Sequence, residues 1–414
     1  MNPNPLLPVD EALAIVLSAA EPGESLPLPL DDALGLFLTE DIGPDIDIPP
    51  FNKATMDGYA LRAGDCRPGA VLPVVGRILA GGKLIESVPP GSAAKIMTGA
   101  PMPSDCDTVL PVELATALGG DRVRCEADLP AGRNVALRGE EMTAGTTVLQ
   151  AGREITPAIC GVLATCGREK VPVRLRPRLG ILVTGNELIN VGQKPGPGQI
   201  RDCNSYSLLA QAREWGAFPD WFGRAADTLK SIRAALSHTL GLDILILSGG
   251  VSAGDVDRVP QALEAAGVET IFHKVAQKPG KPLLFGRRNR TLVFGLPGNP
   301  VSTFVAFELY VGPAIRRMLG DPVPGPRWLT GTAAASFRVR SDRCHFQDAW
   351  AEITPQGWRI EPVRSLGSAD LLAVTRSNAL ARFEAGEYEV QAGDEVRFVC
   401  HRGWSYGAQR SSGA

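Results

Sequence analysis

The sequence is poor in the side chains that bind transition metals and in paired cysteines. It has only 4 His among 414 residues, none at the spacing of a zinc site. Its 8 Cys are scattered, with no C-x-x-C pair. This pattern is typical of reduced thiols and predicts a cytoplasmic protein. Any metal ion is therefore expected to be a hard cation held by oxygen ligands.

The sequence also lacks a strong basic balance and a long apolar run. Its 42 Lys and Arg against 45 Asp and Glu give a formal net charge of −3, which argues against a nucleic-acid partner. No apolar run reaches the ~20 residues that cross a membrane, so we expect no membrane partner. The apolar segment Ala12–Ala20 follows acidic residues, which predicts a helix capped by Asp10 rather than a signal peptide.

What the chain does contain is room for several domains of different character. Pro and Gly interrupt short apolar runs over residues 44–144, a pattern typical of β-structure. From Pro177 onward, continuous apolar segments alternate with helical ones, which predicts a doubly wound, mostly parallel α/β sheet. The Pro-rich linker Gly320–Pro326 precedes a stretch that predicts a small β-domain, whose last hairpin would span residues 387–400.

Helix ends are marked at three places in the sequence. Pro157 lies near the start of one predicted helix, where proline is well tolerated. A second predicted helix, "NSYSLLAQAREWG", would be capped by Asn204 or Ser205 and would end at Gly216.

Polar residues gather where the predicted strands of the central domain end. One apolar strand, for example, runs into a loop of Ser, Gly and Asp in "DILILSGGVSAGDVDR". Ligands of open parallel sheets bind outside the carboxyl ends of the strands, so we expect these residues to line one crevice. They are Thr184, Gly185, Glu187, Asp227, Ser248, Gly249, Gly250, Ser252, Gly254, Asp255, Asp257, Pro297, Gly298, Asn299, Pro300 and Ser302.

The glycine-rich loop after Ser248 has two interpretations. Glycines let backbone N–H groups approach an anion closely, which would make the loop a phosphate cradle. The same composition also suits tight packing of a strand against a helix. The spacing matches neither a GxGxxG fingerprint nor a Walker loop.

The carboxylates at these strand ends point to a cation. Two unit charges about 4 Å apart repel by roughly 4 kcal/mol at an effective dielectric constant near 20. Mg²⁺ would relieve such repulsion, because it takes few carboxylates and completes its shell with water and phosphate oxygens. The alternative for Asp227 and Asp255 is helix capping, a frequent role of Asp.

A loop with two lysines is a candidate oxyanion site. Lys278 and Lys281 lie in "QKPGKP", where Pro279 and Pro282 stiffen the backbone. Two ammonium groups on a rigid loop would bind an oxyanion well. The alternative is an ordinary solvated loop.

The β-rich region has candidate residues of its own. Asp57 precedes Gly58 and Thr98 precedes Gly99, so tight turns are the alternative interpretation of both. Arg138, Glu140 and Glu141 are adjacent in "LRGEE".

With these motifs in place, the chain resembles the MoeA/gephyrin family of molybdopterin molybdenumtransferases. The resemblance covers nearly the whole chain, and its segments occur in the family's order with similar spacing. They are "ATMDGYALR", "KIMTGAPMP", "LRGEE", "LVTGNEL", "ILSGGVSAGDVD", "KPGKPLLFG" and "GLPGNPVS". The ordered set is far more specific than any single segment.

The resemblance implies an α/β and β multidomain protein. Its expected parts are an N-terminal helix with an elongated segment (1–43), a β-rich inserted domain (44–144), a return segment (145–175), a molybdopterin-binding-like α/β domain (176–324) and a C-terminal β-barrel-like domain (325–414). It also implies a homodimer, with the active site between the central domain of one subunit and the inserted domain of the other. The molybdopterin-adenylating protein and maturation factors for molybdoenzymes are the further expected partners.

The implied reaction inserts molybdate into adenylylated molybdopterin, with Mg²⁺, and releases AMP. The matching positions imply catalytic roles for Asp57, Thr98, Glu187, Asp227 and Asp257, and metal binding by Glu187, Asp227, Asp255 and Asp257. Substrate binding is implied for Thr184, Gly185, Ser248, Gly249, Gly250, Ser252, Gly254, Pro297, Gly298, Asn299 and Pro300. Molybdate binding is implied for Lys278, Lys281, Ser302 and Arg376.

The chain departs from the family pattern at three positions. Glu141 stands where the family usually has Asp, Arg258 where an aromatic residue is common, and Asn186 where an acid is frequent. Alternatives on the same fold are a tungstate-handling paralogue and a non-catalytic molybdopterin carrier or scaffold. Adenylylation of molybdopterin is disfavoured, because proteins of that step usually consist of the α/β domain alone.

Overall fold

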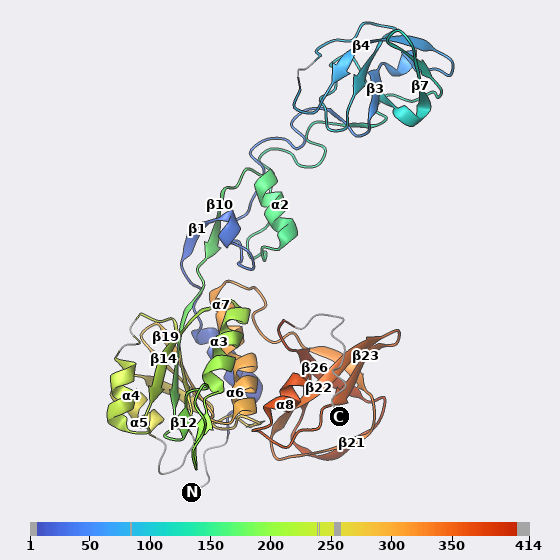
Figure 1. The fold of residues 1–414 in the computed structure, drawn as a ribbon. Coiled ribbons are helices and arrows are strands. Elements are labelled where there is room, and N and C mark those ends of the chain that lie inside the picture. Colours follow the sequence, from blue (N-terminus) through green and yellow to red (C-terminus); the bar gives the residue numbers. More distant parts are fainter. Residues whose placement is uncertain (1–5, 83–84, 238, 240, 252–257, 404–414) are drawn as a thin grey trace. The chain divides into compact units, whose positions relative to one another are not determined.

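The computed structural model describes residues 6–82, 85–237, 239, 241–251 and 258–403 (Figure 1). The chain forms two compact units. The inserted unit comprises Pro27–Leu34 and Glu40–Val171, and the core unit comprises Met1–Leu26, Gly35–Thr39 and Pro172–Ala414. Strands β1 (Ser25–Pro29) and β10 (Lys170–Arg174) pair where the chain passes between these ranges.

A six-stranded sheet dominates the inserted unit. Its order is β6-β3-β5-β4-β8-β7, and only the β4–β5 pair is parallel. Its buried side chains form two apolar clusters, one around Ile96 and Val109 and the other around Leu61 and Val123. The β-rich prediction is thereby confirmed. The strands are β3 (Gly58–Leu61), β4 (Val71–Ile78), β5 (Ala93–Ile96), β6 (Thr108–Pro111), β7 (Ala115–Leu118) and β8 (Arg122–Cys125).

The rest of the inserted unit consists of short elements. Helix α2 (Pro157–Thr165) begins with its proline, as predicted, and the Thr156 hydroxyl accepts a hydrogen bond from Ile159 N. Strands β2 (Lys53–Ala54) and β9 (Val135–Ala136) pair antiparallel. The short 3₁₀ turns are η1 (Leu30–Asp32), η2 (Ala63–Asp65) and η3 (Val112–Leu114).

The core unit contains the predicted mostly parallel sheet, in the order β14-β11-β15-β19-β18-β16. Strands β14, β11, β15 and β19 are parallel, and β18 is antiparallel to its neighbours. Every residue of β15 is buried, which explains its continuous apolar sequence. The strands are β11 (Arg178–Thr184), β14 (Phe218–Ala225), β15 (Ile244–Ser248), β16 (Glu269–His273), β18 (Leu284–Arg288) and β19 (Thr291–Leu296), with the separate pair β12 (Leu188–Ile189) and β13 (Ile200–Arg201).

Helices cover both faces of this sheet (Figure 1). Helices α4 and α5 lie together on one side, and α3, α6 and α7 lie on the other. No helix in the described part of the chain is long and apolar enough to span a membrane. The helices are α1 (Val9–Ala19), α3 (Asn204–Trp215), α4 (Leu229–Leu236), α5 (Val259–Ala265), α6 (Pro300–Ala306) and α7 (Gly312–Met318), with the π-helical segment η4 (Phe307–Val311) between the last two.

Two predicted helix caps were wrong. Helix α1 begins at Val9 after Pro8, so Asp10 lies in its first turn, where its carboxylate accepts hydrogen bonds from Arg382. Helix α3 begins at Asn204, and the carboxylate that accepts from the backbone N of Ser205 belongs to Asp202. The predicted end at Gly216 is confirmed by its left-handed conformation, φ 98°.

The C-terminal domain is a closed barrel of five strands. Strand pairs β22–β23, β23–β20, β20–β26, β26–β24 and β24–β22 complete the ring. The short strand β17 (Gln277–Lys278) joins its edge by pairing parallel with β22. The elements are β20 (Leu329–Ala333), β21 (Phe337–Ser341), β22 (Cys344–Thr354), β23 (Gly357–Pro362), α8 (Leu371–Thr375), β24 (Ala379–Phe383), β25 (Gly386–Val390) and β26 (Glu395–Cys400).

The predicted last hairpin, residues 387–400, was wrong. Strand β25 pairs with β21, whereas β26 pairs with β20 and β24 inside the barrel. The connecting turn is held by Asp394, whose carboxylate accepts from Gln391 N. Local alternation predicted both strands correctly, but their partners lie far away in the sequence.

Candidate active site

The carboxyl ends of β11, β15 and β19 open onto a cavity of about 560 Å³, here called the carboxylate cavity. This is the edge at which doubly wound sheets bind ligands. Most of the predicted strand-end residues line it. They are Thr184, Gly185, Glu187, Asp227, Ser248, Gly249, Gly250, Gly298, Asn299 and Pro300, joined by Val183, Leu188, Ile200, Arg201, Asp202, Cys203, Asn204 and Ala369.

Four predicted residues of the quoted glycine loop, Ser252, Gly254, Asp255 and Asp257, lie outside the described residues. Pro297 is described but is absent from the lining. Its carbonyl oxygen accepts a hydrogen bond from the Ser248 hydroxyl at 3.2 Å.

Close packing explains the first glycines of the loop. Gly249 has φ 97°, and a Cβ atom there would lie 2.5 Å from the carbonyl oxygen of Thr184. The packing interpretation of this loop is therefore supported by its geometry. The Thr184 hydroxyl is also notable, because it is buried in the cavity wall and has no hydrogen-bond partner among the described residues. Such a group is available to a ligand.

Asn204 connects two strand ends, a role that the sequence interpretation missed. Its side-chain amide donates to Ser248 Oγ at 2.9 Å and to Gly298 O at 2.8 Å. The loop after β15 and the turn after β19 are thereby fixed to the start of α3. The sequence signal was an Asn at a helix start, which was interpreted as a cap.

The two described carboxylates predicted to bind metal, Glu187 and Asp227, line the same cavity. Asp227 is no helix cap, because the Thr228 hydroxyl caps α4. Asn186 and Asp227 instead exchange hydrogen bonds: each backbone N donates to the other side chain, at 3.2 and 3.3 Å. Asn186 thus orients Asp227 without adding a charge.

The residues present fit a hard cation only in part. Glu187 and Asp227 supply the carboxylate oxygens that Mg²⁺ prefers. Among the described residues, however, no group of three or more His, Cys, Asp or Glu is placed to hold a metal. A Mg²⁺ ion here would need water, substrate oxygens or the loop residues Asp255 and Asp257 as further ligands.

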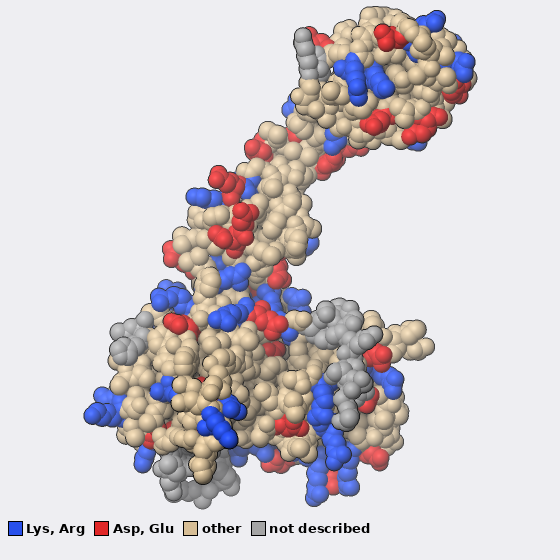
Figure 2. Space-filling view, viewed as in Figure 1, with Lys and Arg blue, Asp and Glu red and all other residues tan. Residues whose placement is uncertain are grey.

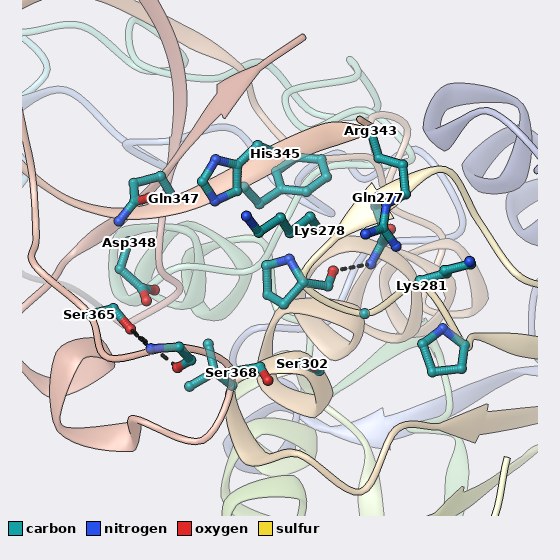
Figure 3. A pocket seen from close by; sticks show the side chains of 16 residues that line it. Gln277, Lys278, Lys281, Ser302, Arg343, His345, Gln347, Asp348, Ser365 and Ser368 are labelled. Carbon is teal, nitrogen blue, oxygen red and sulfur yellow. Dashed lines mark hydrogen bonds between the residues drawn. The ribbon is translucent and has the colours of Figure 1, made fainter. Parts of the chain in front are cut away.

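A second cavity of about 420 Å³, here called the cation cavity, lies where the two-lysine loop meets the C-terminal barrel (Figure 3). Lys278, Lys281 and Ser302 line it, as the oxyanion prediction requires. The other lining residues are Gln277, Pro279, Gly280, Pro282, Val301, Arg343, His345, Phe346, Gln347, Asp348, Ser365, Gly367 and Ser368.

The lysine loop is held by a chain of buried hydrogen bonds. Tyr310 OH donates to Gln277 Oε1 at 2.5 Å, and Gln277 Nε2 donates to the carbonyl oxygen of Pro279 at 3.0 Å. Gly280 has φ 92°, and a Cβ atom there would lie 2.6 Å from Gln277 Nε2. The loop is therefore a fixed element rather than the ordinary solvated loop of the alternative interpretation.

Arg376 does not line the cation cavity. Its guanidinium donates to the carbonyl oxygens of Leu372 and Arg364, at 3.3 and 3.5 Å. Arg343 brings a cation into the lining instead. The sequence interpretation missed Arg343, His345 and Asp348, because only the pairing of β17 with β22 brings them beside the lysine loop.

The two cavities share a wall. Gly298, Asn299 and Pro300 line the carboxylate cavity, and the next residues, Val301 and Ser302, line the cation cavity. On the barrel side, Ala369 lines the carboxylate cavity and the residue before it, Ser368, lines the cation cavity. A carboxylate-lined site and a cation-lined site therefore adjoin.

An outer recess of about 320 Å³ adjoins the cation cavity, because Lys278 and Arg343 line both. Arg340 and Glu387 also line the recess. Figure 2 shows basic side chains, with acidic ones among them, gathered on this part of the C-terminal domain. Arg338 lies on β21, the strand that also carries Arg340, and pairs with Glu387 at 2.5 Å. Asp342 also lines the recess and pairs with Arg343 at 2.9 Å, so cations and carboxylates alternate there.

In the inserted unit, Asp57 and Thr98 lie together. Asp57 Oδ1 accepts from Thr98 N at 2.7 Å and from Thr98 Oγ1 at 2.8 Å. The backbone hydrogen bond, followed by that of the hydroxyl, lowers the pKa of the Asp57 carboxyl. Because both residues are exposed, the carboxylate remains open to a further partner.

The "LRGEE" segment of the inserted unit makes local contacts. Lys53 Nζ pairs with Glu141 at 3.0 Å, and Arg138 pairs with Asp47 at 2.7 Å. Glu140 accepts from Leu137 N at 2.7 Å. Glu141 therefore forms its ion pair with Lys53, a residue of the same unit.

All eight cysteines are free thiols. Cys203 lines the carboxylate cavity, and burial raises the pKa of its thiol. A neutral thiol is a weak nucleophile.

Comparison with known proteins agrees with this architecture. Residues 7–167 match the MoeA N-terminal region (domain I and II), and residues 180–317 match a probable molybdopterin binding domain. The chain is 38% identical to a molybdopterin molybdenumtransferase of Bacillus subtilis, over 77% of this chain and 76% of that protein. It is 37% identical to molybdopterin molybdenumtransferase 2 of Mycobacterium tuberculosis, over 94% of this chain and 98% of that protein.

Among solved structures, the molybdopterin biosynthesis MoeA protein of Pyrococcus horikosii has a TM-score of 0.80 at 28% identity, covering 97% of this chain and 100% of that chain. The fold thus places this protein among those that combine MoeA-type N-terminal regions with a molybdopterin-binding α/β domain. The chain belongs to the molybdopterin molybdenumtransferase family.

Proposed function

We propose that this protein transfers molybdenum from molybdate to molybdopterin, using adenylylated molybdopterin as substrate and releasing AMP. The observation that carries the proposal is the shared wall between two cavities of opposite chemistry. One suits a nucleotide substrate with a metal ion, and the other suits a small oxyanion. Their adjacency would place both substrates side by side, which is a large part of catalysis.

The carboxylate cavity would bind adenylylated molybdopterin. The buried Thr184 hydroxyl has no hydrogen-bond partner in the described part of the chain and would donate to a phosphate oxygen. Gly185, Ser248, Gly249, Gly250, Gly298, Asn299 and Pro300 would form the surrounding wall, with Asn204 keeping two strand ends in place.

Glu187 and Asp227 would hold Mg²⁺, together with Asp255 and Asp257. When bound, the ion would offset negative charge on the pyrophosphate linkage. Asn186 would keep the Asp227 carboxylate in position.

The cation cavity would bind molybdate. Lys278, Lys281 and Arg343 supply positive charge, and the buried Ser302 lies in the same wall. A tetrahedral dianion needs several N–H and O–H donors, which these side chains provide. An oxygen of water or of molybdate would attack the molybdopterin-side phosphorus, and AMP would leave with the bridging oxygen and the bonding electrons of the phosphoanhydride. The two sulfur atoms of molybdopterin would then bind molybdenum and displace molybdate oxygen, which would take up protons and leave as water.

Asp57 and Thr98 would act in a homodimer. They form an exposed hydrogen-bonded pair, and their contacts leave the carboxylate accessible. We infer that the inserted domain of one subunit presents this pair to the central domain of its partner. We also infer that the protein works in the cytoplasm, where its free thiols would stay reduced.

The test measures AMP release from adenylylated molybdopterin by purified protein with Mg²⁺, with and without molybdate. Release that depends on molybdate, with formation of active cofactor, is the expected result. A parallel reaction with tungstate tests the paralogue alternative. Folded protein that binds the substrate but releases no AMP would contradict the proposal and favour a carrier.

A further inference from the structure

The cation cavity contains a carboxyl group with a buried oxygen atom that no described residue contacts by a hydrogen bond. Asp348, on β22, lines the cavity, yet only 5% of the residue is exposed. Its Oδ1 atom is buried and makes no hydrogen bond to any residue that the structure describes. Figure 3 shows this carboxyl group between Gln347 and the Ser365–Ser368 segment. The structure thus places an acid in a site otherwise suited to a dianion.

A buried carboxylate without a partner is costly, so this group must lose its charge or contact a ligand. The charged and titratable groups that line the same cavity are Lys278 and Lys281 from the loop and Arg343 and His345 near the start of β22. Asp370, before α8, lies close enough to act on Asp348 electrostatically. Burial, followed by repulsion from Asp370, raises the pKa of Asp348 to about 6.

His345 is not a proton donor near neutral pH. Burial, with a smaller effect of Lys278, lowers the pKa of its imidazole to about 4. The ring is therefore neutral at pH 7. Of the two cavity residues His345 and Asp348, Asp348 is therefore the one whose pKa lies close to physiological pH.

We propose that Asp348 determines oxyanion specificity: its carboxyl group takes up a proton when a tetrahedral oxyanion enters and donates that proton to one oxyanion oxygen. The inference rests on the proposed function, because it takes the cation cavity as the molybdate site. A dianion close to Asp348 opposes its ionisation, so binding and protonation favour each other.

This arrangement separates molybdate from sulfate. The two are tetrahedral dianions, and the lysines and Arg343 attract both. Molybdate is the more basic of the two, so its oxygen accepts a hydrogen bond from a carboxylic acid more strongly. An ionised Asp348 would repel either anion. Protonating Asp348 costs free energy above its pKa, and only the stronger hydrogen bond to the more basic anion offsets that cost.

The test is calorimetric titration of the full chain with sodium molybdate, from pH 6.5 to 8, in buffers of different ionisation enthalpy. We expect uptake of about one proton per molybdate near pH 7.5, and an affinity that falls by up to about tenfold per pH unit. Asp348→Asn keeps a hydrogen-bond donor but cannot titrate. It should abolish proton uptake and lower the molybdate-to-sulfate affinity ratio by about fivefold or more.

Glu352→Gln is the matched control. Glu352 lies on the same strand with an exposed side chain, 4.0 Å from Arg359. It should leave affinity, proton uptake and the anion ratio unchanged. If Asp348→Asn fails to fold, the buffer series on the unmodified chain decides alone.

Binding of molybdate without proton uptake would overturn the inference, as would an unchanged anion ratio in folded Asp348→Asn. Molybdate-dependent AMP release by the same preparation would then show that the proposed function stands. If the unmodified chain neither binds molybdate nor releases AMP, the proposed function fails and the inference falls with it.

Discussion

Single carboxyl groups in this protein differ mainly in what surrounds them. Asp57 is exposed, and hydrogen bonds from Thr98 lower the pKa of its carboxyl. Glu308, in the π-helical segment η4, is buried, and burial raises the pKa of its carboxyl to about 7. Gln211 Nε2 and Trp215 Nε1 donate to its Oε1, at 2.8 and 3.1 Å. The first group is open to solvent and the second is enclosed by packed side chains. We therefore expect substitution of Asp57 to affect activity and substitution of Glu308 to affect stability.

Asp57→Ala should abolish activity without unfolding the protein. We expect AMP release to fall about 100-fold or more, because an exposed carboxylate that would act on substrate is lost. The free energy of unfolding should fall by no more than about 1 kcal/mol, since solvent can replace hydrogen bonds at an exposed site.

Glu113→Ala, an exposed position of the same unit, is the control for Asp57→Ala and should change neither quantity. The measurements are AMP release and denaturant unfolding. Full activity of Asp57→Ala would remove this residue from the proposed site.

Glu308 should make stability fall as pH rises. The pKa of its carboxyl is about 7 in the folded protein against an ordinary 4.5. As the pH rises, Glu308 therefore ionises at a lower pH in the unfolded chain than in the folded one. Its contribution is complete below pH 4.5 and is lost as the pH rises to about 7, on the order of 3 kcal/mol.

Glu308→Gln keeps an acceptor oxygen for Gln211 and Trp215 but cannot ionise. Its loss of stability between pH 5 and 8 should therefore be smaller than that of the unmodified chain by about 2.5 kcal/mol, because part of the contribution is already lost at pH 5. Urea unfolding at both pH values measures this difference. An equal pH dependence in the two proteins would show that Glu308 ionises as freely when folded as when unfolded.

At the scale of elements, the loops after β15 and around Gly280 differ in what they need to keep their shape. The first depends on the absence of a side chain, because Gly249 packs against the strand end at Thr184. The second depends on a buried hydrogen-bond chain from Tyr310 through Gln277. Both loops would fail from changes that leave the chemistry of the cavities untouched.

Gly249→Ala should cost about 2 kcal/mol of folding stability, because the residue would need φ 97° with a Cβ 2.5 Å from Thr184 O. Gly192→Ala, where an added Cβ meets nothing within 4 Å, is the matched control. Thermal and denaturant unfolding measure both variants. Equal stability of the two would mean that the β15 loop relaxes freely.

Tyr310→Phe should weaken molybdate binding although Tyr310 lies outside the cavity lining. Without its hydroxyl, Gln277 loses a partner at 2.5 Å, and the lysine loop loses support. We expect molybdate affinity to fall about fivefold and stability to fall by about 1–2 kcal/mol.

Tyr388→Phe, which removes an exposed hydroxyl that donates to Glu384 O at 3.3 Å, should leave molybdate affinity unchanged. Calorimetric titration compares the two variants. Unaltered affinity in folded Tyr310→Phe would show that the loop keeps its shape without this bond.

At the scale of the whole molecule, the proposed homodimer can be tested by complementation. Asp57→Ala and Asp227→Asn should each be inactive alone. If each site uses Asp57 of one subunit and Asp227 of the other, an equal mixture with exchanged subunits contains about half mixed dimers, each with one intact site. About a quarter of the normal AMP release should then return. No recovery in a mixture shown to exchange would place both residues of a working site in one subunit.

Parts of this molecule followed from the sequence, for reasons that are local. Continuous apolar segments alternating with helices predicted the parallel sheet, because a strand buried on both faces needs apolar residues throughout. The rule that ligands bind at carboxyl strand ends then predicted most of the carboxylate cavity, including Thr184, Glu187 and Asp227. Helix caps were less predictable, because residue type alone does not identify them. Asp202 accepts a backbone hydrogen bond at the start of α3, whereas Asp10 accepts from the side chain of Arg382.

The sequence by itself determined the family, the character of each domain and the carboxylates at the strand ends, because these depend on composition, periodicity and order along the chain. Only the tertiary structure decided the cation cavity. It arises because β17 pairs with β22 and brings Arg343, His345 and Asp348 beside Lys278 and Lys281. Pairing between distant strands depends on packing of the whole barrel, which no local pattern specifies.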